Sequence, residues 1–168
     1  MSTRRKPGRF NAREMFTLAE VLMASPTNPM PAADARARYE ATLHHLEQLA
    51  AAPEPSPLDW RTVAMAGNVL EALLAADVID DPERVLADGF AAMRAAASRP
   101  KIRFTGDELQ AVRAMVRNWG TVLEQCPHRM LLQAFRRVYA DIQRRDASAI
   151  ENGDLATQLN GWRASSAA

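Results

Sequence analysis

Apolar residues recur along most of the chain at intervals of three and four positions. Residues spaced in this way lie on one face of an α-helix, and the polar residues between them lie on the other face. The clearest stripe falls between positions 105 and 126 and consists of Leu109, Val112, Val116, Trp119 and Leu123. The polar–apolar alternation at 101–104 is too short to predict a sheet. The pattern therefore predicts an all-α protein, a helical bundle of about five to six helices.

Capping residues and prolines indicate where several of these helices begin. Asp59 is the predicted N-cap of a helix whose apolar residues are numerous enough to bury more than one side. Asp81, Pro82 and Glu83 predict the next start, with a cap, a proline at the first helical position and an acid in the first turn. Thr105–Glu108 has the spacing of a capping box and predicts a third start.

Three further helices are predicted at the two ends of this region. One begins at Asn11, ends before Pro26, and carries a stripe of Met15, Leu18, Ala19 and Leu22. The next begins at Pro31 and turns inward Tyr39, Leu43, Leu46 and Leu49. The last follows Pro127 and turns inward Leu131, Phe135, Val138 and Ile142.

A proline-rich segment at 53–57 is the strongest predicted boundary, because its three prolines interrupt the helical pattern. The predicted organisation is a flexible basic arm at 1–10, a helical hairpin at 11–52, a four-helix core at 58–147 and a disordered tail at 148–168. The chain of 168 residues is long enough to bury a core without disulfides. The pattern leaves open whether the hairpin packs on the core.

Charge is unevenly distributed, although the formal net charge is only +1. The arm carries Arg4, Arg5, Lys6 and Arg9, and the region around the last helix carries Arg129, Arg136, Arg137, Arg144 and Arg145, with Asp141 among them. The acidic middle carries Glu71, Asp77, Asp80, Asp81, Glu83 and Asp88. We interpret the basic residues as candidate contacts for nucleic acid or a partner, and the acidic residues as a candidate partner surface. The alternative is a solvated surface whose charges pair within one molecule, or between two copies in a homodimer.

No group of residues has the spacing expected of an active site or a metal centre. His44 and His45 are adjacent, so on a helix they point about 100° apart and do not chelate one ion together. Cys126 precedes His128 at a predicted helix start, a setting that lowers a thiol pKa, but a small residue packed in a helix turn fits this pair better. Glycine-rich phosphate loops and nucleophile elbows do not occur in the sequence. We therefore predict a non-enzymatic protein without a metal or cofactor.

The sequence also indicates in which cellular compartment the protein is located. The single cysteine, Cys126, excludes an intramolecular disulfide and favours a reducing environment. No run approaches 18 apolar residues, so no membrane span is predicted. The apolar stretch after the first basic residues contains Glu14 and Glu20, which the apolar region of a signal peptide does not carry. These features predict a cytoplasmic protein that does not associate with membranes.

Several short motifs in the chain are similar to those of a known group of proteins. They are Trp60-Arg61-Thr62-Val63-Ala64, Asn68, Glu71-Ala72-Leu73, Asp81-Pro82 and Cys126-Pro127-His128-Arg129. Over about residues 58–145 the chain resembles small helical proteins encoded on proteobacterial phages and plasmids. The resemblance implies an accessory product of a mobile element and brings no biochemical activity with it.

Two main functions are consistent with these observations, and a structural or assembly subunit is a minor third. The first is a helical interaction protein that binds a host or element-encoded protein as a regulator or inhibitor. The exposed apolar residues of the first predicted helix would suit such docking, unless they complete the core. The second is a DNA- or RNA-binding regulator that uses the basic arm and the arginine-rich last helix, although no helix-turn-helix spacing supports it.

Overall fold

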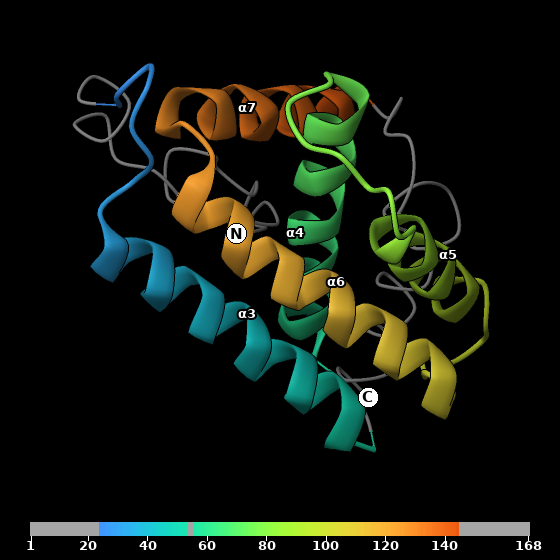
Figure 1. Ribbon diagram of the computed structural model, residues 1–168. Coiled ribbons are helices and arrows are strands. Elements are labelled where there is room, and N and C mark those ends of the chain that lie inside the picture. The colour runs from blue at the N-terminus through green and yellow to red at the C-terminus, as the bar shows by residue number, and fades with distance from the viewer. Residues whose placement is uncertain (1–23, 54–55, 145–168) are drawn as a thin grey trace, which may run out of the picture.

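The computed structural model describes residues 24–53 and 56–144, and within them the chain forms five α-helices and no strand. The helices are α3 (Ala32–Ala51), α4 (Pro57–Ala75), α5 (Val85–Ala97), α6 (Gly106–Gln125) and α7 (His128–Arg144). The prediction of an all-α helical bundle is confirmed (Figure 1). The basic arm, the first predicted helix and the tail lie outside the described residues.

Capping boxes start two of the helices. At α6 the box is the predicted one: the Thr105 side chain accepts from the Glu108 backbone, and the Glu108 carboxylate accepts from the Thr105 N–H at 2.7 Å. At α4 the predicted N-cap, Asp59, is wrong by one turn. Ser56 is the N-cap, and the carboxylate of Asp59 accepts from the Ser56 N–H at 3.1 Å. Asp59 is therefore the third residue of the helix, whose carboxylate closes the capping box, and Ser56 is the N-cap.

The start of α5 differs from the prediction. Asp81 does not cap a helix that begins at Pro82; instead, α5 begins at Val85 after Arg84, which adopts the left-handed conformation with φ 59°. The two carboxylate oxygens of Asp81 accept from the backbone N–H groups of Leu86 and Ala87, at 3.0 and 2.9 Å. The acid therefore still satisfies the exposed donors of a helix start, but across an intervening turn.

The helix α4 is central to the bundle. It contacts each of the other four helices, and its residues 63–70 are all buried (Figure 1). This confirms the prediction that this helix is covered on more than one side. Its Trp60 is completely buried and stacks on Phe104, with ring centroids 6.2 Å apart. The segment 101–104 is thus an irregular connection whose apolar side chains, Ile102 and Phe104, join the core.

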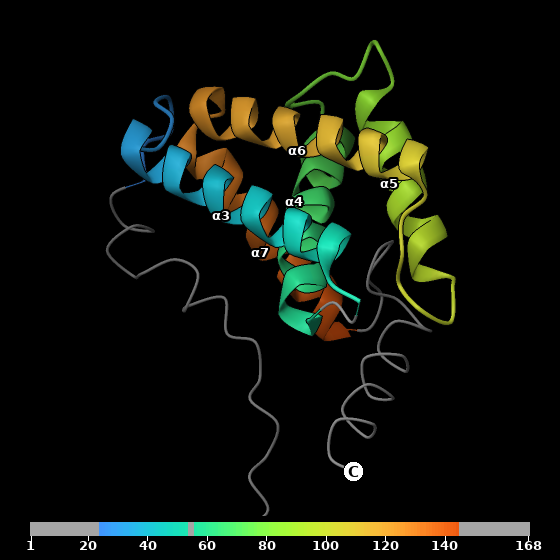
Figure 2. The ribbon, with the colours of Figure 1, turned by 90° about the horizontal axis from the view of Figure 1, so that it is seen from below.

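The helix α3 packs against both α4 and α6, and it runs beside α6 (Figure 2). A methyl group added at Gly120 would lie 2.9 Å from the ring of Tyr39, so the two helices approach closely there. Arg113 of α6 donates two hydrogen bonds to Glu47 of α3, at 3.0 and 2.8 Å. The predicted faces of this helix are confirmed, since Leu46 and Leu49 are buried and the polar side is exposed. A hairpin of this helix with the preceding one remains a prediction.

No helix among the described residues is long and apolar enough to cross a membrane.

Candidate functional site

The exposed side of α7 is a stripe rich in arginine, which we call the arginine face. It consists of Arg129, Gln133, Arg136, Arg137 and Ala140, all exposed and spaced three or four residues apart. The opposite side packs into the bundle through Leu131, Phe135 and Val138. The sequence therefore predicted correctly which side of this helix is buried. Arg144 lies on the helix near its end, and Arg145 lies outside the described residues.

The first turn of α7 is held by the segment that precedes α3. The N–H of His128 donates to the carbonyl of Asn28 at 2.9 Å, and the N–H of Arg129 donates to the carbonyl of Ser25 at 3.0 Å. The Ser25 hydroxyl in turn accepts from the Asn28 N–H at 2.9 Å. Backbone donors at a helix start need partners, and these come here from a segment about 100 positions earlier in the chain. This anchoring fixes the orientation of the arginine face.

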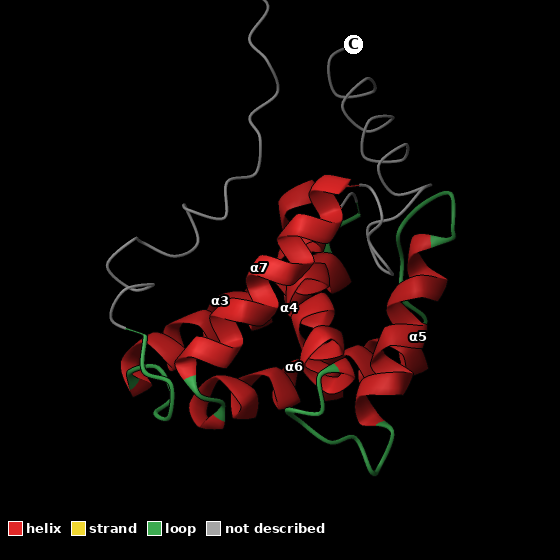
Figure 3. Ribbon diagram, turned by 90° about the horizontal axis from the view of Figure 1, so that it is seen from above, coloured by secondary structure: helices red, strands yellow, loops and turns green. Residues whose placement is uncertain are grey.

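The arginine face carries no acidic residue. Asp141, which the sequence placed among these arginines, is half-buried at the edge of the face toward α4. There it lines a small cleft together with Glu71, Asn68 and Arg137. Arg136 and Arg137 form no ion pair with any residue of the described ranges. Arg136 and Arg137 are therefore two neighbouring guanidinium groups exposed to the solvent. Figure 3 shows the course of α7, the helix that carries them.

The six acidic candidate residues differ in their exposure and in their interaction partners. Glu71 is half-buried and pairs with Arg94 of α5. Asp81 binds the backbone at the start of α5. The other four are exposed, and they are Asp77, Asp80, Glu83 and Asp88. Three of these lie in the turn that follows α4, and we call this segment, residues 76–84, the acidic turn.

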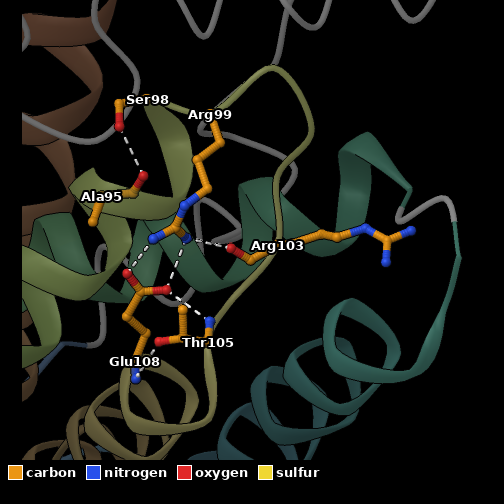
Figure 4. Close-up of polar contacts among 6 residues, drawn as sticks. All are labelled: Ala95, Ser98, Arg99, Arg103, Thr105 and Glu108. Atoms are coloured by element: carbon orange, nitrogen blue, oxygen red, sulfur yellow. Dashed lines mark hydrogen bonds and ion pairs between the residues drawn. The ribbon is translucent and has the colours of Figure 1, made fainter.

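A second polar cluster joins the end of α5 to the start of α6 (Figure 4). Arg99 donates to both carboxylate oxygens of Glu108 and to the carbonyl of Arg103. Together with the backbone N–H of Thr105, these donors lower the pKa of Glu108 to about 2. Because each oxygen of this carboxylate already accepts a hydrogen bond, the cluster is a structural link and not a site for a ligand.

A histidine–carboxylate pair that the sequence analysis missed links α3 to α4. The Nδ1 atom of His45 lies 2.7 Å from one oxygen of Asp59, and the other oxygen belongs to the capping box. The residues are 14 positions apart on two helices, so no local spacing reveals them. His44 is exposed on the other side of α3. Among the described residues, no group of three or more potential ligands could hold a metal ion.

The environment of Cys126 is that of a packed residue. Cys126 is the C-cap of α6, and its N–H donates to the carbonyl of Val122 at 2.8 Å. The side chain is buried, and burial raises the pKa of the Cys126 thiol. A raised thiol pKa leaves little nucleophilic thiolate near neutral pH. This agrees with the structural interpretation of the Cys126–His128 pair.

The bundle also contains an apolar cavity of about 250 Å³ between α3, α4, α6 and α7. Its apolar lining includes Ala41, Leu58, Met65, Ala66, Trp119 and Phe135. Arg38 and Arg61 contribute to its wall, and Leu58 is 57% exposed, an unusual value for a large apolar side chain in this bundle. Because four helices contribute to the lining, only the tertiary structure reveals this cavity.

Comparison of the chain with known proteins identified no relative. No family, no curated protein and no solved structure matches the chain. The class of protein is therefore defined by the fold, an all-α helical bundle.

Proposed function

We propose that the chain is a non-enzymatic interaction protein that binds an acidic surface of a partner protein through the arginine face of α7. The observation that carries the proposal is the pair Arg136 and Arg137, exposed side by side without an acid on their face. Guanidinium groups bind carboxylates through two parallel hydrogen bonds, and a rigid helix reduces the entropy lost on binding. Each bidentate contact therefore adds both affinity and orientation.

The surroundings of the arginine face favour a protein over a nucleic acid. The last turns of α4 share a cleft with Arg137, so the acidic turn that follows α4 lies near this end of α7. Its exposed residues Asp77, Asp80 and Glu83 would repel the uniformly negative backbone of a nucleic acid. A protein surface that carries both acidic and basic residues would interact favourably with the arginine face and with the acidic turn.

The proposed role is that of a regulator or inhibitor. A small bundle without a catalytic group acts on another molecule by covering part of its surface. The resemblance to accessory proteins of phages and plasmids favours this role, and it directs the search to partners encoded by a bacterial host or by the element itself.

The test compares the wild-type chain with Arg136→Ala/Arg137→Ala in affinity capture from nuclease-treated host lysate. The control is Lys101→Ala/Arg117→Ala, which removes the same charge from exposed positions outside α7. We expect the wild type and the control to retain the same protein and the α7 variant to lose it. With the purified partner, the Kd of the α7 variant should rise by about 10- to 100-fold, as for interface arginines elsewhere.

Two results would contradict the proposal. Equal retention by all three proteins would show that the arginine face is not the contact. Retention that disappears on nuclease treatment, with gel-shift binding that falls steeply with salt, would instead establish a nucleic-acid-binding regulator.

A further inference from the structure

The small cleft between α4 and α7 is lined by a buried amide without a hydrogen-bond partner. Asn68 of α4 has only 9% of its surface exposed, and its side chain forms no hydrogen bond with a described residue. By contrast, the exposed Asn118 of α6 donates to the carbonyl of Ala114 at 3.3 Å. Because nearly all buried polar side chains in folded proteins are hydrogen-bonded, the unpaired amide of Asn68 calls for a physical explanation.

Local structure does not explain this asparagine. It lies within α4, where asparagine is a poorer helix former than leucine. It is also the only polar residue among the buried residues 63–70, at a position where an apolar side chain would be buried at lower cost. Helix propensity and burial therefore both disfavour an amide at this position, and the cleft that Asn68 lines offers the explanation.

The cleft has the size of a small functional group. Its volume is about 80 Å³, which corresponds to about three water molecules. Its apolar walls come from both helices and consist of Ala72, Ala75, Val138 and Ile142. Arg137 lines it from α7, and its guanidinium forms no ion pair with a described residue. One bound group in so small a cleft can therefore contact both Asn68 and Arg137.

The polar groups of the cleft select the chemistry of its ligand. The Asn68 amide offers both a donor and an acceptor, whereas the Arg137 guanidinium offers only donors. An ammonium group has no acceptor for Arg137. A carboxylate has no donor for Asn68, and the carboxylates of Glu71 and Asp141, which also line the cleft, would repel it. A primary carboxamide supplies both kinds of group, because its carbonyl accepts from Arg137 and its amino group donates to the Asn68 oxygen.

We propose that this cleft binds a primary carboxamide, supplied by a glutamine or asparagine side chain of the partner protein. The inference rests on the function proposed above, because Arg137 belongs both to the arginine face and to the cleft. The methylene groups of the partner's side chain pack against the apolar walls. The cleft thus adds specificity for a neutral group to a face that otherwise binds acidic residues.

The test uses propionamide as the probe, in NMR titrations of the full chain labelled with nitrogen-15. Propionate, which has the same shape but carries a carboxylate, is the matched control. We expect propionamide to cause saturable shifts of the Asn68 side-chain signals and of backbone amides around the cleft. The Kd should be on the order of 1–100 mM, as for other ligands of this size. Propionate should bind at least about tenfold more weakly, because it leaves the acceptor of Asn68 unpaired.

Substitutions assign the shifts to the cleft. Asn68→Leu should abolish propionamide binding and raise the Tm by about 2–4 °C, since it replaces an unpaired amide with an apolar side chain of similar volume. Ala75→Leu fills the cleft from an exposed position and should also abolish binding, without changing a core side chain. Arg137→Ala should raise the Kd for propionamide by about tenfold. Arg136→Ala is its control, because Arg136 does not line the cleft, and should leave this Kd unchanged.

Binding of the purified partner tests whether the carboxamide belongs to a protein. Asn68→Leu should raise the Kd of the partner by about tenfold, as expected when a buried polar contact at an interface is lost. Asn118→Leu makes the same change at an exposed position of α6 and should leave the Kd of the partner unchanged.

Four results would overturn the inference. They are the absence of saturable shifts with propionamide, equal affinity for propionamide and propionate, a Tm of Asn68→Leu below that of the wild type, and an unchanged Kd of the partner in Asn68→Leu. The titration with propionamide needs no partner protein, and Arg136 contributes only to the arginine face. Failure of the cleft is therefore distinguishable from failure of the arginine-face proposal.

Discussion

The helices α6 and α7 are similar in length and amphipathic pattern, but their charged residues are used differently. On α6, Glu108 binds Arg99 at the end of α5, and Arg113 binds Glu47 on α3. On α7, Arg136 and Arg137 form no ion pair with a described residue. Glu108 and Arg113 of α6 therefore join other segments of the bundle, whereas Arg136 and Arg137 of α7 are exposed to the solvent.

Burial explains this difference. The helix α6 lies between α3 and α5, so both edges of its polar face meet charged side chains of a neighbour (Figures 1 and 2). The helix α7 packs chiefly on α4, through its apolar side, and its other side has no neighbour among the described helices. The position of a helix in the bundle therefore decides whether its charged residues can meet partners on a neighbouring helix.

The largest expected effect concerns the buried face of α6. Leu123→Ala removes a completely buried side chain and should destabilise the protein by about 2–5 kcal/mol, through lost burial and the cavity left behind. Chemical denaturation measures the free energy of unfolding. Thr121→Ala, at an exposed position of the same helix, is the control and should change it by less than about 0.5 kcal/mol. Similar losses in both variants would contradict the assigned packing of α6.

A smaller effect is expected for the link between α5 and α6. Glu108→Gln weakens the ion pair with Arg99 and the capping box at Thr105, and it should cost about 1–2 kcal/mol. Glu124→Gln, an exposed change of the same kind on α6, should cost almost nothing. A cost for Glu108→Gln no larger than for Glu124→Gln would show that the link is not stabilising.

The same residue gives a pH dependence with a defined sign. The pKa of Glu108 is lowered from 4.5 to about 2 in the folded chain. Its contribution to stability is therefore complete above pH 4.5 and is lost as the pH falls toward about 2. The difference in unfolding free energy between wild type and Glu108→Gln should shrink over this window. A difference that stays constant down to pH 2 would contradict the lowered pKa.

The smallest effect on stability is expected on α7. Arg136→Ala/Arg137→Ala removes no ion pair with a described residue and should change the unfolding free energy by less than about 0.5 kcal/mol. Alanine also has the higher helix propensity, so a slight stabilisation would agree with the structure. A loss above about 1 kcal/mol would show that these arginines hold the bundle together, as the charges of α6 do.

Local signals predicted helix starts to different degrees. At Thr105 and Glu108 the box spans one turn and satisfies its own backbone donors, so the prediction was correct. At Asp81 the same kind of side chain reaches Leu86 and Ala87 across a turn that contains a left-handed Arg84. A carboxylate identifies a nearby helix start, but the intervening backbone decides which N–H groups it meets. Such conformations depend on packing and are not encoded in the cap residue.

The candidate sites were predictable only in part. The exposure of Arg129, Arg136 and Arg137 follows from the apolar positions of their own helix. The pairing of Glu71 with Arg94, and that of His45 with Asp59, joins residues from different helices. The apolar cavity likewise needs side chains from four helices. These features depend on how the helices are placed against one another.

The sequence by itself determined that this protein is built of helices and which side of each described helix faces the core, because both follow from spacing within one segment. Only the tertiary structure decided that α4 lies at the centre, that Glu108 and Arg113 of α6 pair with other segments whereas Arg136 and Arg137 of α7 form no ion pair with a described residue, and that an apolar cavity opens beside Leu58. The physical reason is that burial, ion pairing and cavity shape arise between segments distant in sequence, where helical periodicity carries no information.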